Sequence, residues 1–115
     1  MLSERERNAL LDILENIGHA ETFLADTSKD ELATDTLRFY AVTRALEIIS
    51  EASRRLPATI KDRHPDAPWQ QIAGAGNIYR HGYDYVSAAV VWQTVKLSLP
   101  ALRAIVEDEI QREGE

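Results

Sequence analysis

The amino-acid sequence predicts an all-α protein, an up-and-down bundle of four to five helices. Apolar residues recur at helical spacing in long stretches, and no run of β-branched residues alternates with polar ones as a half-buried strand would. Two Ser-x-x-Glu sequences, at Ser3 and Ser28, match the capping box that begins a helix. A chain of 115 residues, 44% hydrophobic and 28% charged, suffices for one globular core, so we expect a single domain over residues 1–115.

The first helix is predicted to begin at Ser3 and to end near Asp26. His19 lies on it and is expected to be a surface or packed residue rather than a metal ligand. An apolar stripe runs along this helix and comprises Leu10, Ile13, Ile17, Ala20 and Leu24, widened by Leu14 and Phe23.

The next helical region begins at Ser28, is expected to break near residues 33–35, and continues to Leu56 before Pro57. The stripe expected to face the core comprises Leu37, Ala41, Ala45, Ile48, Ile49, Ala52 and Leu56. Charged side chains occupy the remaining face, namely Arg38, Arg44, Glu47, Glu51, Arg54 and Arg55.

Residues 57–68 are expected to be irregular, with room for a single helical turn anchored by Ile60 and with His64 exposed. A short helix then begins at Pro68. Gly74 and Gly76 lie inside it, and each costs about 1 kcal/mol relative to Ala. Two such costs predict that a backbone or a ligand comes close to this helix.

The last helix is expected to be capped by Ser87. Its stripe, Val91, Val95, Leu99, Leu102, Val106 and Ile110, resumes in phase beyond Pro100. Because proline removes one hydrogen bond and clashes with the preceding turn, we predict a kink near residues 96–99 rather than an end.

Composition excludes several classes of site and of protein. The chain has no cysteine, which excludes disulfides, a thiolate nucleophile and a Cys-ligated metal. Its net charge of −6 argues against nucleic-acid binding over the whole surface, although residues 32–100 carry eight bases and six acids. The charged start MLSERERN has no signal-peptide pattern, and no stretch has the apolar run of a spanning helix, so we expect a cytoplasmic protein without membrane contact.

Chemistry, if present, is expected between Ile72 and Tyr85. Imidazole, with an unperturbed pKa of roughly 6.5, allows His81 to exchange a proton near neutral pH, and Arg80 beside it could bind a phosphate or carboxylate. Tyr83 adds a hydroxyl. An Arg-His-Gly run is equally an ordinary helix C-terminus, since cations favour the last turn and glycine the cap.

These segments resemble the HepT-like toxin family of the HEPN superfamily. The resemblance covers RALEIISEASRRLP, the His64 to Gly74 lead-in, VVWQTVKLSLPAL, and the Asn-x-x-x-His-x-Tyr pattern at Asn77, His81 and Tyr83. It implies a helical bundle that cleaves RNA without a metal or other cofactor, using Arg and His at a homodimer interface. It also implies a minimal nucleotidyltransferase antitoxin as partner, which in some systems modifies the motif Tyr, here Tyr83.

One residue departs from the family motif Arg-Asn-x-x-x-His-x-Tyr, because Gly76 stands where the family has Arg. Proton transfer is assigned to His81, but the cation for charge on the phosphate is missing. Arg80 is the nearest replacement, and it could act only if the helix ends there. Arg44 or Arg38 of the long helix is a second source, within one chain or across the dimer.

Three functions therefore remain open. The first is a HepT-like ribonuclease toxin with a rearranged cation, with Asn77, Arg44 and Arg38 as binding residues. The second is a catalytically weak or inactive HEPN module that binds a nucleotide or its nucleotidyltransferase partner, and the third is a purely structural helical dimer. Metal chemistry is disfavoured because the three histidines have no ligand spacing and His81 has no acidic cluster near it beyond Asp84.

Overall fold

In a computed structural model the chain is all-α, as predicted, and no strand occurs among the residues that the structure describes. These are residues 1–81 and 87–114 for the backbone, and residues 1–76 and 87–114 for the side chains. The helices, in chain order, are α1 (Glu4–Leu24), α2 (Lys29–Thr34), α3 (Thr36–Ser53), α4 (Ala58–Arg63), α5 (Trp69–His81), α6 (Ala88–Gln93), the π-helical turn η2 (Thr94–Ser98) and α7 (Leu99–Gly114).

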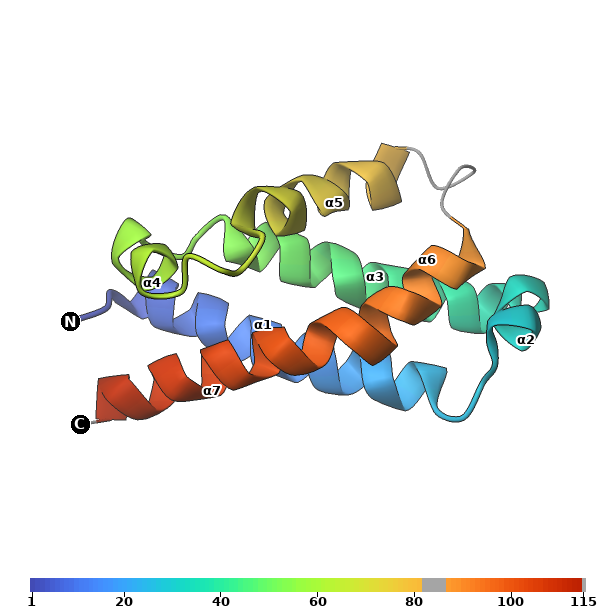
Figure 1. The fold of residues 1–115 in the computed structure, drawn as a ribbon, viewed down its shortest axis with the longest axis horizontal. Coiled ribbons are helices and arrows are strands. Elements are labelled where there is room, and N and C mark those ends of the chain that lie inside the picture. Colours follow the sequence, from blue (N-terminus) through green and yellow to red (C-terminus); the bar gives the residue numbers. More distant parts are fainter. Residues whose placement is uncertain (82–86, 115) are drawn as a thin grey trace.

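The long helices lie side by side along the long axis of the molecule (Figure 1). Helix α3 has its most extensive packing with α1 and α5, and α1 also packs on α7. The short α2 lies at one end, while α4 and both chain termini lie at the other (Figure 1).

Local sequence explains where these helices begin. Ser3 and Ser28 each form a complete capping box, in which the serine hydroxyl accepts the amide of Glu6 or Glu31 and that glutamate accepts the serine amide in return. Asp35 separates α2 from α3 and caps α3 by accepting the Arg38 amide at 3.0 Å. Ser87 accepts the amide of Val90 at 3.1 Å and so caps α6. The expected helix starts and the break near residues 33–35 are confirmed.

The predicted stripe of α1 from Leu10 to Leu24 is buried, with Ala9 in addition, but the phase predicted for the first half of α3 is wrong. Leu37 is 83% exposed, whereas Val42 and Leu46 are buried. Because α1 and α5 cover α3 from two sides, more than one stripe of this helix is buried. Phe23 of α1 is also exposed and stacks on the ring of His19, with the ring centroids 5.6 Å apart.

The expected irregularity before Pro100 has the form of a π-helical turn. In η2 the Leu99 amide donates to the carbonyl of Thr94, five residues back, instead of four. This wider turn lies immediately before the proline. The buried stripe continues through this turn at four-residue spacing, with Val91, Val95 and Leu99 all buried. This spacing lies between the period of an α-helix and that of a wider helix.

The run Ala88–Gly114 is one helix by length, and its most apolar window has a mean hydropathy of 1.2, enough by composition to cross a membrane. We expected no such stretch. Only 28% of that window is buried, and its buried side, including Val95, Leu102 and Val106, belongs to the core. A single helix of this kind is by itself weak evidence for a membrane span.

Candidate active site

His81 is the last residue of α5, so the candidate site lies where this helix ends. The side chains of Asn77, Arg80 and His81 are outside the described part of the chain, and so is Tyr83 altogether. The backbone of α5 remains helical through His81. Helical positions 80 and 81 differ by about 100° around the axis. Because α5 ends at His81 and the Arg80 side chain lies outside the described residues, replacement of the motif cation by Arg80 stays a prediction.

Gly76 is buried where α5 meets α3, at the position of the family Arg. Its amide donates to the hydroxyl of Ser50 at 2.8 Å. A Cβ atom at residue 76 would lie 2.7 Å from Ser50 Oγ and 3.0 Å from Ser50 Cβ. The predicted close approach is therefore confirmed at Gly76. It is wrong at Gly74, where a Cβ would meet no atom within 4 Å.

The carbonyl of Ala73, one turn earlier, accepts three side-chain hydrogen bonds from α3 and its C-cap residue Arg54. Ser50 Oγ donates to it at 2.9 Å. Arg54 donates twice, from Nε at 3.0 Å and from Nη2 at 2.6 Å. Together with the bond from Gly76 to Ser50, these contacts fix α5 against α3; we call Ser50 and Arg54 with the Ala73 carbonyl the α3–α5 clamp.

The clamp also shows that α3 and α5 are antiparallel, because Arg54 meets Ala73 while the earlier Ser50 meets the later Gly76. From Gly76 to His81 the helix advances about 7.5 Å at about 1.5 Å per residue. The same advance from Ser50 back along α3 reaches residue 45, next to Arg44. Arg44 is thus level with the end of α5.

Arg44 is well placed for an anion from solvent. Its side chain is 61% exposed, and Arg44 Nη1 contacts Glu47 Oε1 at 2.8 Å. A surface ion pair of this kind contributes only about 0–1 kcal/mol, so a phosphate could replace it at small cost. Glu47 has additional interactions of its own.

Arg38, the other candidate from the long helix, is engaged elsewhere. It contacts Asp35 at 3.2 Å and donates to the carbonyl of Phe23 on α1. The pKa of Asp35 lies below its ordinary value, chiefly because its carboxylate accepts a hydrogen bond from the backbone amide of Arg38. Arg38 therefore joins the start of α3 to α1. Measured along α3, it lies about 10 Å beyond the position that is level with His81.

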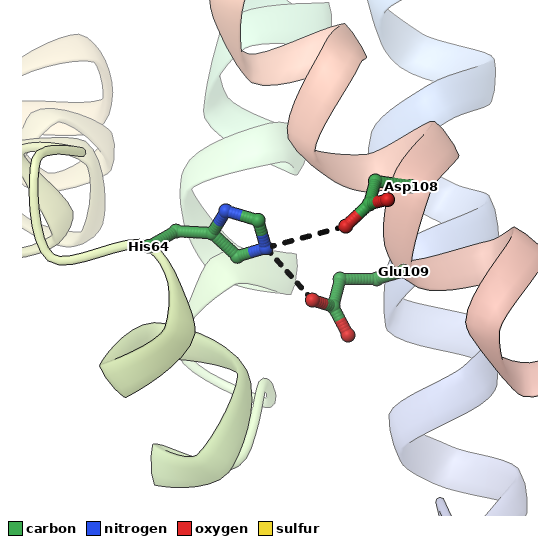
Figure 2. Close-up of side chains that lie close together, drawn as sticks. All are labelled: His64, Asp108 and Glu109. Atoms are coloured by element: carbon green, nitrogen blue, oxygen red, sulfur yellow. Dashed lines mark hydrogen bonds and ion pairs between the residues drawn. The ribbon is translucent and has the colours of Figure 1, made fainter.

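A second charged cluster joins α4 to α7. Glu109 is buried, and its carboxylate contacts Arg63 at 3.0 and 2.5 Å. The same carboxylate contacts His64 Nε2 at 2.7 Å (Figure 2). Hydrogen bonds from Arg63 first, and from His64 second, hold the pKa of Glu109 below its ordinary value, although burial opposes them. His64 is thus only 19% exposed, and its expected exposure in a loop is wrong.

His64, Asp108 and Glu109 have the ligand types of a metal site, with donor atoms within 4.8 Å of one another (Figure 2). The sequence offered no such spacing, because His64 lies 45 residues before Glu109. Two guanidinium groups oppose a metal ion here: Arg63 binds Glu109 through two nitrogens, and Arg112 contacts Asp108 at 2.9 Å. The cluster is best explained as a structural ion-pair network.

An apolar pocket of about 350 Å³ lies beside the clamp, between α3, α5 and the α6–α7 run. Ile72, Ala75 and Ser50 line it from the clamp side. Leu99, Ala101 and Ile105 belong to the opposite wall. Polar groups on its walls are few, so the pocket is suited to apolar contact rather than to phosphate chemistry.

The chain matches the Ribonuclease HepT-like family over residues 13–109. It is 36% identical over 107 residues to a "Putative RNase MJ1380" of Methanocaldococcus jannaschii, an alignment that covers 92% of this chain and 98% of the relative. It is 35% identical over 106 residues to a "Probable ribonuclease HepT" of Thermococcus cleftensis, covering 92% and 96% of the two chains. No solved structure matches it.

The chain therefore belongs to the Ribonuclease HepT-like family. This confirms the resemblance drawn from the sequence and supports ribonuclease activity as the class of function. Sequence reasoning did not identify Ser50 as a neighbour of the motif, because its role depends on the packing of α3 against α5.

Proposed function

We propose that this protein is a metal-independent endoribonuclease in which His81 transfers the proton and Arg44 stabilises charge on the phosphate. The observation that carries the proposal is the antiparallel packing of α3 on α5, which brings the exposed Arg44 level with the end of α5. It supports Arg44 over Arg38, whose guanidinium holds α1 and α3 together.

The reaction would use the RNA's own 2′-hydroxyl. Its oxygen attacks the adjacent phosphorus while a base removes its proton; the bond to the 5′ oxygen breaks, and that oxygen receives a proton. The products are a 2′,3′-cyclic phosphate and a 5′-hydroxyl. Imidazole exchanges protons near neutral pH, and a fixed cation stabilises the charge that develops on the phosphate oxygens.

We further propose that two copies form a homodimer, that the protein is the toxin of a toxin–antitoxin pair, and that a minimal nucleotidyltransferase antitoxin is its partner. Support comes from the family and from the apolar pocket beside α5, which leaves apolar surface for a second copy. Light scattering at tens of micromolar tests the dimer, and a monomer there would contradict it.

A catalytically weak or inactive module that binds nucleotide or a nucleotidyltransferase remains the second candidate. The observation in its favour is the contact between Gly76 and Ser50, because a side chain at residue 76 would require Ser50 or α5 to shift. In that case Arg44 would contribute to binding and not to cleavage.

Cleavage of a single-stranded RNA in the presence of EDTA tests the proposal, with Arg44→Ala compared with Arg38→Ala. We expect Arg44→Ala to lower kcat by about 10²–10³, the loss typical of one transition-state donor, with little change in melting temperature. Arg38→Ala should instead lower stability and leave kcat nearly unchanged. Equal kcat for Arg44→Ala and wild type would overturn the role of Arg44, and absence of cleavage by wild type would favour the binding module.

A further inference from the structure

We infer that Arg54 and Ser50 are positioning residues: through the Ala73 carbonyl they set where the His81 end of α5 lies relative to Arg44. This inference rests on the proposed function. A mid-helix carbonyl ordinarily accepts one amide of its own helix, whereas Ala73 also accepts Arg54 twice, at 3.0 and 2.6 Å, and Ser50 at 2.9 Å. Such a concentration of donors on one atom restrains α5 more than apolar contact does.

The two parts of the clamp restrain different motions. Ser50 is 2% exposed and binds both Ala73 and Gly76, so it fixes how closely and at what rotation α5 packs. Arg54, the C-cap residue of α3, reaches the same carbonyl with two guanidinium nitrogens, and its charge strengthens both bonds. Sliding α5 along α3 would break both sets of bonds together.

Catalysis depends on such a restraint because the two proposed groups are on different helices. His81 is eight residues from Ala73, about 12 Å along the helix, so a small tilt at the clamp displaces the end of α5. A displacement of about 1 Å in a reacting group can cost about 10² in rate. The same 12 Å excludes Arg54 from the role of catalytic cation, since its guanidinium is bound at Ala73.

Arg55 supplies a matched control. It follows Arg54 in the turn after α3 and contacts Asp12 of α1 at 2.8 Å. Arg54→Ala and Arg55→Ala therefore remove the same side chain and one anchoring interaction each. Only the first releases α5.

The experiment measures kcat and KM for cleavage of single-stranded RNA, with EDTA present, for wild type, Arg54→Ala, Arg54→Gln and Arg55→Ala. We expect Arg54→Ala to lower kcat at least tenfold with little change in KM, and Arg54→Gln to recover part of it, since an amide can still donate to a carbonyl without a charge. Arg55→Ala should keep kcat. The positioning role would be overturned if kcat fell in both alanine variants. It would also be overturned if Arg54→Gln had a kcat as low as that of Arg54→Ala together with a raised, salt-dependent KM.

A second readout separates this inference from the proposed activity. The imidazole NMR signals of His81 should shift or broaden in Arg54→Ala and in Ser50→Ala but not in Arg55→Ala, with the signals of His19 and His64 as internal references. These changes in the His81 signals are expected even if the wild type cleaves no RNA. Absence of cleavage would refute the ribonuclease proposal but not the clamp. Unchanged His81 signals in all three variants would refute the clamp.

Discussion

Substitution of the two glycines of α5 should change stability in opposite directions. In Gly76→Ala the new Cβ would lie 2.7 Å from Ser50 Oγ and 3.0 Å from Ser50 Cβ. The hydroxyl can rotate away, but the Cβ cannot, so α5 must move. In Gly74→Ala the new Cβ meets no atom within 4 Å.

The magnitudes follow from the same contacts. Overpacking costs about 1–3 kcal/mol, and displacing the Ser50 hydroxyl loses hydrogen bonds of about 1 kcal/mol each, to Gly76 and to Ala73. Replacing a helical Gly by Ala returns about 1 kcal/mol. Gly76→Ala should therefore lower the free energy of unfolding by about 2–4 kcal/mol. Gly74→Ala should raise it by up to about 1 kcal/mol.

Urea denaturation followed by circular dichroism measures both changes, and the double variant Ser50→Gly/Gly76→Ala tests their cause. Removing the Ser50 side chain makes room for the Cβ, so the double variant should be more stable than the sum of the single changes by about 1 kcal/mol or more. Gly76→Ala as stable as Gly74→Ala, or strict additivity in the double variant, would refute the close contact.

Three further predictions concern charge, the motif cation and the partner. In Glu109→Gln the free energy of unfolding should fall by roughly 2–3 kcal/mol at pH 7, because hydrogen bonds to a buried carboxylate are lost. Since the folded-state pKa of Glu109 is lowered, the difference between the two proteins should shrink as the pH falls below 4.5, the ordinary pKa of this group. Acid titration of both proteins, followed by circular dichroism, measures this. In Ser50→Gly/Gly76→Arg an Arg side chain regains room on α5, so RNA cleavage assays should find altered activity in this variant, whereas Gly76→Arg alone should mainly unfold in a thermal melt. A cognate nucleotidyltransferase with ATP should add mass to wild type and not to Tyr83→Phe by mass spectrometry, and an unmodified wild type would end that proposal.

Features governed by neighbouring residues could be predicted from the sequence. The capping boxes at Ser3 and Ser28 depend on contacts three residues apart, so the start of each helix followed from the sequence. Pro100 predicted a disturbance at residues 96–99. Its form as a π-helical turn was not predictable, because it depends on which carbonyl the Leu99 amide reaches.

Features governed by helix packing could not be predicted in this way. A double glycine predicted a close approach to α5, but only the structure identifies Ser50 as the neighbour and Gly76, not Gly74, as the residue involved. Leu37 was placed in the core because a single buried stripe was expected on α3. In the structure α1 and α5 cover α3 from two sides, and Leu37 is exposed.

The candidate site divides in the same way. His81 and Tyr83 were proposed from their side-chain chemistry and from the family pattern. The choice between Arg44 and Arg38 depends instead on the antiparallel register of α3 and α5. Glu109 was missed as the partner of His64, because no local pattern joins residues 45 positions apart.

The most direct test of the account is the initial rate of RNA cleavage by wild type and His81→Ala, purified identically and assayed with EDTA. We expect cleavage by the wild type that yields 2′,3′-cyclic phosphate ends, and a rate at least about 10² lower for His81→Ala at an unchanged melting temperature. Equal rates for the two proteins, or wild-type activity that EDTA abolishes, would contradict it.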